Sequence, residues 1–200
     1  MASSVDQIQL RHDFLEGMSR VRATVCVVTT DGGFGRAGIT VSAMTSLSLD
    51  TPTPSLLICI NQLSPACQAI TGNEVFCVNV LRDDQSDLSD VFAGRIAPPG
   101  QDKFTIGEWT IRKSGAPVLA NPVVAFDCTL RHRLDWGSHR MFIGELVDLV
   151  LGEYGSPLIY ADRTYGRSVP LPLLDRDDSR GKSAAAMIDL GGFTTSEKNE

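Results

Sequence analysis

The sequence predicts a mainly β domain, a closed or nearly closed antiparallel barrel with short flanking helices. Two observations carry this prediction. Roughly six or seven short apolar or alternating segments are separated by turn residues, which is the pattern of strands joined by hairpins. No Gly-x-Gly-x-x-Gly turn opens a long helix, which argues against a parallel dinucleotide-binding sheet.

The first half of the chain alternates helix and strand signals. Residues 6–19 place Leu10, Phe14 and Met18 four residues apart, which predicts a helix that packs through one face. Strand-like runs at 23–30 and 37–43, broken by Asp-Gly-Gly, predict a hairpin. Short apolar runs at 55–60 and 75–80 predict two further strands. A helix over 64–72 is expected between them, because Ser64 can cap it, Pro65 suits its first position and Gly72 suits its end.

The second half contains the longest strand signals. A helical pattern over 83–95 has acids in its first turn. A loop-rich stretch follows at 97–121 and holds one short strand at 109–111. Alternation with a period of two over 123–134, a turn at 135–138 and a second run at 139–152 predict a long antiparallel pair. A last short strand is expected at 157–160. Residues 1–169 are expected to form one domain, and the polar, Gly-rich residues 170–200 an exposed or partly disordered tail.

Composition argues against several classes of protein. Acidic residues outnumber basic ones 24 to 18 without a Lys/Arg cluster, so no nucleic-acid partner is expected. Apolar runs are too short for a membrane span and the first 20 residues lack a leader pattern, so we expect a cytoplasmic protein without membrane association. The five cysteines are widely spaced without a Cys-x-x-Cys pair; we expect small buried thiols and no metal site.

Polar residues gather at two places beside predicted strands. Residues 40–48 contain small hydroxyl side chains and no charge. Such a segment could offer amide, carbonyl and hydroxyl groups to the polar edge of a flavin ring. On this segment alone, a strand with a polar outer face is the simpler interpretation. Residues 61–65 lie between a strand end and a helix start, where free N–H groups and the Ser64 hydroxyl could hold a flavin phosphate. A plain helix cap explains the same residues and is compatible with that role.

The three histidines have different expected roles. His139 lies in the turn between the two long strands beside Gly137, Ser138 and Arg140. It could contact a nicotinamide, and a surface turn residue is the alternative. His132 falls on the apolar face of its strand and is expected in the core. His12 is expected on the outer surface of the first helix.

The order and spacing of five motifs resemble the flavin reductase-like domain family, the small reductase components of two-component flavin monooxygenases. The resemblance covers nearly residues 14–167, and the order of the motifs is far more specific than any one of them. The motifs are TVSAMTSLSLDTPTPSLLICIN at 40–61, VFCVNVL at 75–81, FAGR at 92–95, HRMFIGELVDL at 139–149 and PLIYADRTYG at 157–166.

The resemblance implies a dimeric FMN-binding split barrel with Greek-key strand order. It implies an NAD(P)H:flavin oxidoreductase that moves a hydride from NADH or NADPH to FAD or FMN. The reduced flavin would go to a partner monooxygenase, typically one that acts on a phenol or another aromatic compound. A non-catalytic split-barrel carrier or sensor for flavin or haem is the main alternative. A pyridoxamine-phosphate-oxidase-like enzyme would need more Arg and Lys around the pocket, and a structural dimer without a ligand is the remaining reading.

The resemblance also implies roles for particular residues. The flavin ring is expected against residues 42–46, the phosphate near Asn61 and Ser64, and the nicotinamide beside His139 as the catalytic residue. The family often has Gly-Asp-His at this turn, whereas this chain has Ser138 before His139, which leaves the orientation of the imidazole open. The full set of expected cofactor residues is Thr40, Ser42, Ala43, Met44, Thr45, Ser46, Asn61, Ser64 and Tyr165.

Overall fold

A computed structural model describes residues 4–153 and 155–170 of the chain. The chain divides into two units, Met1–Ser168 and Val169–Glu200, and the first unit is described below. The expected tail lies outside the described residues except for its first residue, so the domain boundary stays a prediction. None of the helices within 4–153 and 155–170 combines the length and apolar character needed to cross a bilayer.

The first unit consists mainly of strands, as the sequence predicts. Its helices are α1 (Ser4–Arg20), α2 (Pro65–Asn73) and α3 (Ser86–Phe92), with short 3-10 turns at Pro99–Gln101 and Lys103–Thr105. Its strands are β1 (Ala23–Thr24), β2 (Cys26–Thr30), β3 (Ala37–Val41), β4 (Met44–Ser48), β5 (Ser55–Asn61), β6 (Val75–Val80), β7 (Trp109–Ile111), β8 (Pro117–Leu119), β9 (Val124–Trp136), β10 (His139–Leu151), β11 (Leu158–Ala161) and β12 (Thr164–Arg167).

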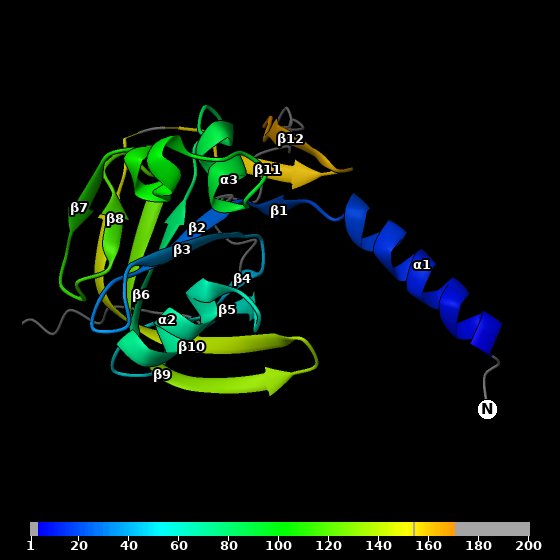
Figure 1. The fold of residues 1–200 in the computed structure, drawn as a ribbon, viewed down its shortest axis with the longest axis horizontal. Helices are drawn as coiled ribbons and strands as arrows, with labels where there is room; N and C mark the ends of the chain where they lie inside the picture. Colours follow the sequence, from blue (N-terminus) through cyan, green and yellow to red (C-terminus); the bar gives the residue numbers. More distant parts are fainter. Residues whose placement is uncertain (1–3, 154, 171–200) are drawn as a thin grey trace, which may run out of the picture. The chain divides into compact units, whose positions relative to one another are not determined.

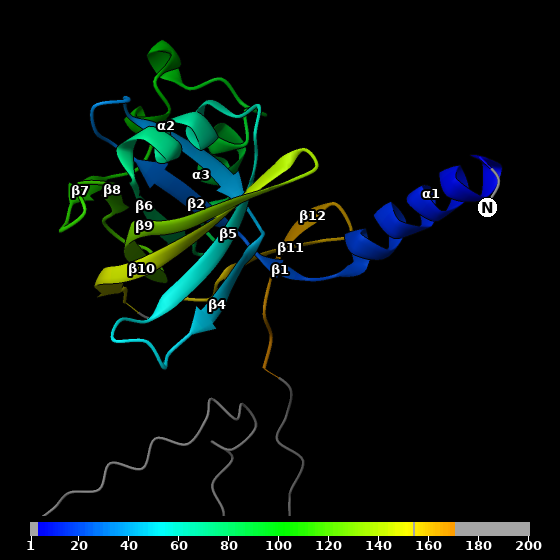
Figure 2. The same cartoon turned by 90° about the horizontal axis from the view of Figure 1, so that it is seen from below.

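Seven strands form one sheet in the order β3-β2-β6-β9-β10-β5-β4, and every neighbouring pair is antiparallel. Its two edge strands, β3 and β4, are consecutive in the chain, and only Ser42 and Ala43 separate them. Since neighbouring Cα atoms lie about 3.8 Å apart, the two edges must meet at this link. The sheet therefore curls into a split barrel (Figures 1 and 2). We call the line where β3 and β4 diverge from Ser42 and Ala43 the seam.

Helices and two small sheets cover the outside of the barrel. α2 links β5 to β6 and packs on β2 and β3, and α3 packs on β3 and β2 (Figure 1). β7 pairs with β8, and β1, β11 and β12 form a three-stranded sheet. This cover explains why all five residues of β2 are buried: one face of the strand points into the barrel and the other lies under α3 and β8.

Two large apolar clusters lie on opposite sides of the sheet. The barrel interior is filled from β2, β5, β6, β9 and β10, and α2 closes it with Cys67 and Ile70. The outer cluster joins α3 to β2, β8 and β11. The five cysteines are unpaired; four are buried and Cys59 is half-buried, which confirms the expectation of small thiols. Burial raises the pKa of the Cys26 thiol to about 12, so it stays protonated.

The structure corrects three expectations about particular side chains. The face of α1 that was expected to pack leaves Leu10, Phe14 and Met18 at least half exposed. His132 is exposed rather than in the core, because residues 131–136 at the end of β9 are exposed on both faces of the strand. Gly72 does not end α2: the left-handed residue that follows the helix is Glu74, with φ 60°.

The run expected as one strand at 23–30 is divided into β1 and β2, which lie in different sheets. Three further strands were not expected as separate elements. β4 was considered only as one interpretation of residues 40–48, β8 falls in the stretch expected to be loop, and β12 lies just beyond the last expected strand. All three are short, and β8 and β12 each contact a neighbour in a small sheet. Their stability depends on partners that lie distant in sequence or across a tight turn, which a local pattern does not contain.

Gly144 on β10 tests how tightly the barrel interior is packed. An added Cβ there would overlap Phe76 Cζ and lie 2.9 Å from Cys128 Cβ. Gly144→Ala is therefore expected to lower the free energy of unfolding by about 1–3 kcal/mol through overpacking. Gly166→Ala is the matched strand control, because no heavy atom lies within 4 Å of its Cβ position. Denaturant unfolding of the two variants measures the difference, and equal stability would contradict this packing.

Candidate functional site

The seam exposes backbone at two sheet edges. β3 has β2 as its only neighbour in the seven-stranded sheet, and β4 has only β5. The outer sides of both strands thus carry N–H and C=O groups without a strand partner. The link between them is fixed by a hydrogen bond from Cys59 N to Ala43 O at 3.1 Å. Thr45 and Ser46 on β4 are exposed, and the segment carries no charged side chain.

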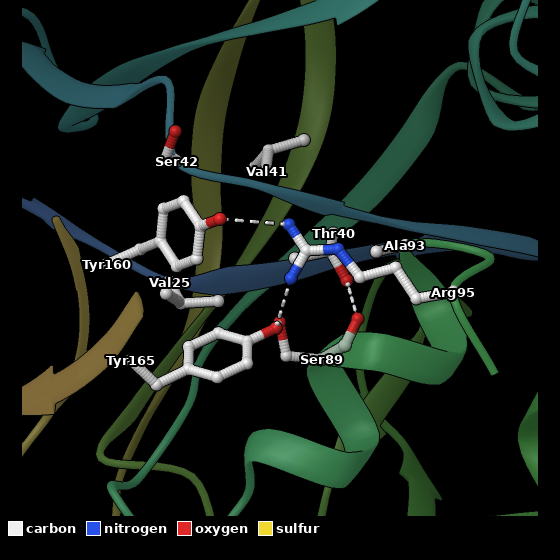
Figure 3. Close-up of a pocket in the computed structure, with 9 residues that line it drawn as sticks. All are labelled: Val25, Thr40, Val41, Ser42, Ser89, Ala93, Arg95, Tyr160 and Tyr165. Atoms are coloured by element: carbon white, nitrogen blue, oxygen red, sulfur yellow. Dashed lines mark hydrogen bonds between the residues drawn. The ribbon is translucent and has the colours of Figure 1, made fainter. Parts of the chain in front are cut away.

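A cavity of about 190 Å³ lies at the β3 end of the seam (Figure 3). The walls include the apolar side chains of Val25, Val41 and Ala93. Hydroxyl groups come from β3, the link, α3, β11 and β12, and Arg95 supplies the positive charge. The hydroxyl residues are Thr40, Ser42, Ser89, Tyr160 and Tyr165.

Hydrogen bonds connect the polar residues around this cavity. Arg95 donates to Asp90 at 3.1 Å, to the Tyr165 hydroxyl at 3.2 Å and to the Tyr160 hydroxyl at 3.3 Å. The Tyr165 hydroxyl in turn donates to Asp90 Oδ1 at 2.6 Å. Burial, followed by this hydrogen bond to Asp90, raises the pKa of Tyr165, so the phenol stays protonated. The Thr40 hydroxyl donates to the Ser89 carbonyl at 2.7 Å.

A second group of polar residues forms a row across β9, β10 and β5. His139 pairs with Trp136 on one side and with Asn61 on the other. Directly opposed residues project from the same face of a sheet. All three are exposed, and the Trp136 side chain is 78% exposed. Asn61 lies two residues beyond Cys59, so this row continues the seam on the side of β5.

The turn that carries His139 is held in place from β5 and α2. Gly137 has φ 56°, a left-handed conformation that glycine adopts without strain. The Gln62 amide donates to the Gly137 carbonyl at 3.1 Å and to the His139 carbonyl at 3.2 Å, and Gln62 N donates to the Ser138 carbonyl at 3.0 Å. The Ser138 hydroxyl lies 3.0 Å from His139 Nδ1. It therefore contacts the imidazole from the position where the resemblance leads one to expect an aspartate.

Arg140 braces the same hairpin from its other face. Its guanidinium donates to both carboxylate oxygens of Asp135, at 2.5 and 2.9 Å, and to the Thr71 hydroxyl of α2 at 3.0 Å. The hydrogen bond from Arg140 lowers the pKa of Asp135, so the carboxylate stays charged. The residue next to His139 is thereby tied to both β9 and α2.

Ser64 acts as the N-cap of α2, as the sequence predicts. Its hydroxyl accepts a hydrogen bond from Ala66 N at 3.2 Å, and the Asn61 side-chain oxygen accepts one from Leu63 N at 2.9 Å. Gln62 joins this loop to the His139 turn. The structure therefore brings Asn61, Ser64 and His139 into one region.

The expected site residues fall into two groups, one at the cavity and one at the β9–β10 turn, with the link and β4 beside them. Thr40, Ser42 and Tyr165 lie at the cavity, and Ala43, Met44, Thr45 and Ser46 lie on the link and β4. Asn61, Ser64 and His139 lie around the turn. Sequence reasoning missed Arg95, Tyr160, Ser89 and Trp136. Arg95 and Tyr160 fall inside the FAGR and PLIYADRTYG motifs, which were available as signals for them.

Comparison with known proteins adds independent information about this arrangement. The model of the flavin reductase like domain matches residues 18–168, which include both groups and the strands between them. The chain belongs to the flavin reductase like domain family. The match begins within α1 and ends just after β12.

Family members with named activities are similar over most of the chain. The FMN reductase (NADH) RutF of Ancylobacter novellus is 41% identical over 155 residues, which is 78% of this chain and 83% of that protein. The NADH:FAD oxidoreductase SgcE6 of Streptomyces globisporus C-1027, solved in complex with NAD and FAD fragments, is 27% identical with a TM-score of 0.70. It covers 85% of this chain and 97% of its own. The nitrilotriacetate monooxygenase component B homolog of Mycobacterium thermoresistibile is 25% identical with a TM-score of 0.74, covering 86% and 96%.

The donor set along the seam fits the flavin that gives this family its name. A flavin ring carries neutral carbonyl and N–H groups along one edge and needs apolar cover on its faces. The exposed hydroxyls of Thr45 and Ser46 and the unpartnered backbone of β4 are neutral donors and acceptors of that kind. Within residues 4–153 and 155–170, no group of three His, Cys, Asp or Glu side chains could hold a metal ion.

Replacing Ser64 tests its role as a cap. Ser64→Ala removes the hydrogen bond to Ala66 N and is expected to lower the free energy of unfolding by about 1 kcal/mol. Ser64→Asp preserves a capping acceptor and is expected to remain within about 0.5 kcal/mol of the parent. Thermal or denaturant unfolding compares the two variants. Two equally destabilised variants would show that the cap hydrogen bond is not the stabilising contact.

Proposed function

We propose that the chain is an NADH-dependent flavin reductase that uses FMN, and FAD as a second acceptor. NADPH is the alternative donor. The reduced flavin would pass to a partner monooxygenase acting on an aromatic, phenolic compound. The names of the relatives support the choice of NADH and FMN, the monooxygenase component B homolog supports the partner, and the aromatic substrate rests on the resemblance of the motifs.

The observation that carries this proposal is the uncharged open edge of β4, which starts at the link beside the cavity. When bound, flavin accepts a hydride directly from a nicotinamide, so the protein needs to supply stacking, orientation and electrostatics. Neutral backbone and hydroxyl groups beside β4 meet that need. Paired carboxylates or an activated nucleophile, which hydrolytic chemistry would use, are not among the residues of this edge.

We assign distinct tasks to the link with β4 and to the residues around the β9–β10 turn. Residues 42–46 hold the polar edge of the ring through backbone amides and hydroxyls. Asn61 and the start of α2 at Ser64 receive the phosphate, because a helix N-terminus favours an anion. His139, whose Nδ1 contacts Ser138, orients the nicotinamide. Restricting both rings in this way converts a bimolecular encounter into a reaction within one complex.

We also propose that the reductase is a cytoplasmic homodimer. Several large apolar side chains are exposed in the single chain, including Phe14 at 63%, Leu134 at 58% and Trp136 at 78%. Burying such residues between copies would offset their contact with water. Light scattering of the purified protein measures its mass, and a monomer at micromolar concentration would contradict the dimer.

NADH oxidation in the presence of added FMN or FAD tests the catalytic proposal. We expect turnover that depends on free flavin, with NADH and FMN giving the highest kcat/KM in a comparison of both nicotinamides with both flavins. A carrier or sensor, the alternative function, would bind flavin without consuming NADH. A turnover rate that does not depend on added flavin would contradict the release of reduced flavin to a partner.

The role of His139 is tested by replacing it and, separately, the second histidine of the β9–β10 hairpin, His132. His139→Ala is expected to raise the KM for NADH by about tenfold, the value of one charge-assisted or well-oriented hydrogen bond. The Kd for FMN should change by less than about twofold. His132→Ala is the matched control. His132 lies on β9, is exposed like His139, and pairs with Ile143, away from the row formed by Trp136, His139 and Asn61. Equal loss of NADH use and flavin binding in His139→Ala would contradict the assignment.

A further inference from the structure

The cavity at the β3 end of the seam has the walls of a site for a flat ring. The aliphatic side chains of Val25, Val41 and Ala93 line part of it, and the rings of Tyr160 and Tyr165 meet edge to face with centroids 5.3 Å apart. Its volume of about 190 Å³ is below the roughly 300 Å³ at which pockets begin to enclose a whole drug-sized ligand. The cavity therefore fits one end of a nucleotide rather than all of it.

Arg95 is the cation of this cavity, and its direction is fixed by three acceptors. Figure 3 shows the guanidinium between the hydroxyls of Tyr160 and Tyr165, and a third N–H donates to Asp90. The hydrogen bond to Asp90 raises the pKa of Arg95, so the side chain stays charged. A guanidinium carries five N–H groups; the remaining two have no acceptor among residues 4–153 and 155–170 and are available to a ligand.

The Asp90 carboxylate beside Arg95 determines which kind of ligand can bind to the guanidinium. Its carboxylate is paired with Arg95 and accepts from Tyr165, so the pair has little net charge. A phosphate at Arg95 would also approach the Asp90 carboxylate, and like charges at short range repel. A neutral ring with a carbonyl oxygen gains the guanidinium hydrogen bonds without that repulsion. The Thr40 hydroxyl is already used by the Ser89 carbonyl, and Arg95 is the charged donor among the residues that line the cavity.

We propose that this cavity binds the amide-bearing edge of a planar heterocycle, with Arg95 donating to its carbonyl oxygen. The inference rests on the proposed function, which supplies two such edges: the pyrimidine end of the flavin and the carboxamide of the nicotinamide. Ser42 connects the cavity to β4, so a ring that enters here continues along the seam. Arg95 then determines specificity for the ring and does not read the phosphate.

Arg95→Gln tests this assignment with ligands that separate ring from phosphate. Lumiflavin carries the ring alone, and FMN carries the ring with the phosphate. We measure the Kd of both by fluorescence titration and the KM for NADH. If the flavin edge occupies the cavity, both flavin Kd values rise by about tenfold and KM changes less than about twofold. If the nicotinamide edge does, the KM rises about tenfold and both Kd values stay unchanged.

Two other outcomes overturn the proposal. A loss confined to FMN would place the phosphate at Arg95, and three unchanged values would show that Arg95 contacts neither ring. Ser64→Asp provides the opposite pattern, because a carboxylate at the α2 start should weaken FMN and leave lumiflavin unchanged. If the parent protein binds flavin and oxidises NADH, and Arg95→Gln has the same Kd and KM values, only this inference fails. Absence of turnover in the parent would instead contradict the proposed function.

Matched variants separate ligand contact from structural damage. Arg36 pairs with Asp102 at 2.8 Å and lies 4.6 Å from the Phe104 ring centroid, so Arg36→Gln removes a similar half-exposed arginine outside the cavity. It should leave all three constants within about twofold. Tyr160→Phe removes one hydrogen-bond acceptor of Arg95 while keeping the aromatic ring. It should raise whichever constant Arg95→Gln raises, the flavin Kd values or the KM for NADH, by about threefold. If Arg95→Gln does not fold, Tyr160→Phe with unchanged constants would still overturn the proposal.

Discussion

The link of two residues between β3 and β4 is the constraint on which the rest of the structure depends. These strands are the two edges of a seven-stranded sheet, so a link this short forces the sheet to close on itself. Closure encloses the core inside the barrel and leaves a seam where the edges diverge. Backbone groups that would pair with another strand in a complete barrel remain available there. The candidate site lies along this seam because it is the place where the sheet lacks a neighbour.

The two ends of the seam owe their chemistry to elements distant in sequence. At the β3 end, α3 and the β11–β12 hairpin supply the Arg95, Tyr160 and Tyr165 cluster. Beyond the link, at the Asn61 end of β5, the β9–β10 turn presents His139. Gln62 and Arg140 tie that turn to β5 and α2. The barrel thus holds both groups of side chains in place, and in the proposed function they position the two rings between which the hydride moves.

Much of this arrangement could be predicted from the sequence, because strand alternation, the Ser64 cap and the turn at 137–138 are local signals. Membership in the flavin reductase like domain family follows from the order of motifs and is confirmed. The exposure of His132 was not predictable from alternation alone, since both faces of a strand end can project beyond the layer that covers them. Arg95 was missed because its role depends on Asp90 and two tyrosines that lie about 65 and 70 residues further along the chain. The exposed face of α1 shows the same limit: a helical period predicts an apolar face but not what covers it.

Hydrogen–deuterium exchange of the backbone, with and without saturating FMN, tests the central claim most directly. Edge amides of β4 without a strand partner should exchange quickly in the free protein and be protected when flavin is added. We expect the protection to cover residues 42–48 and the loop at 61–64, with no change in β7. Flavin binding that leaves β4 exchange unchanged, or that protects only segments away from the seam, would contradict the account.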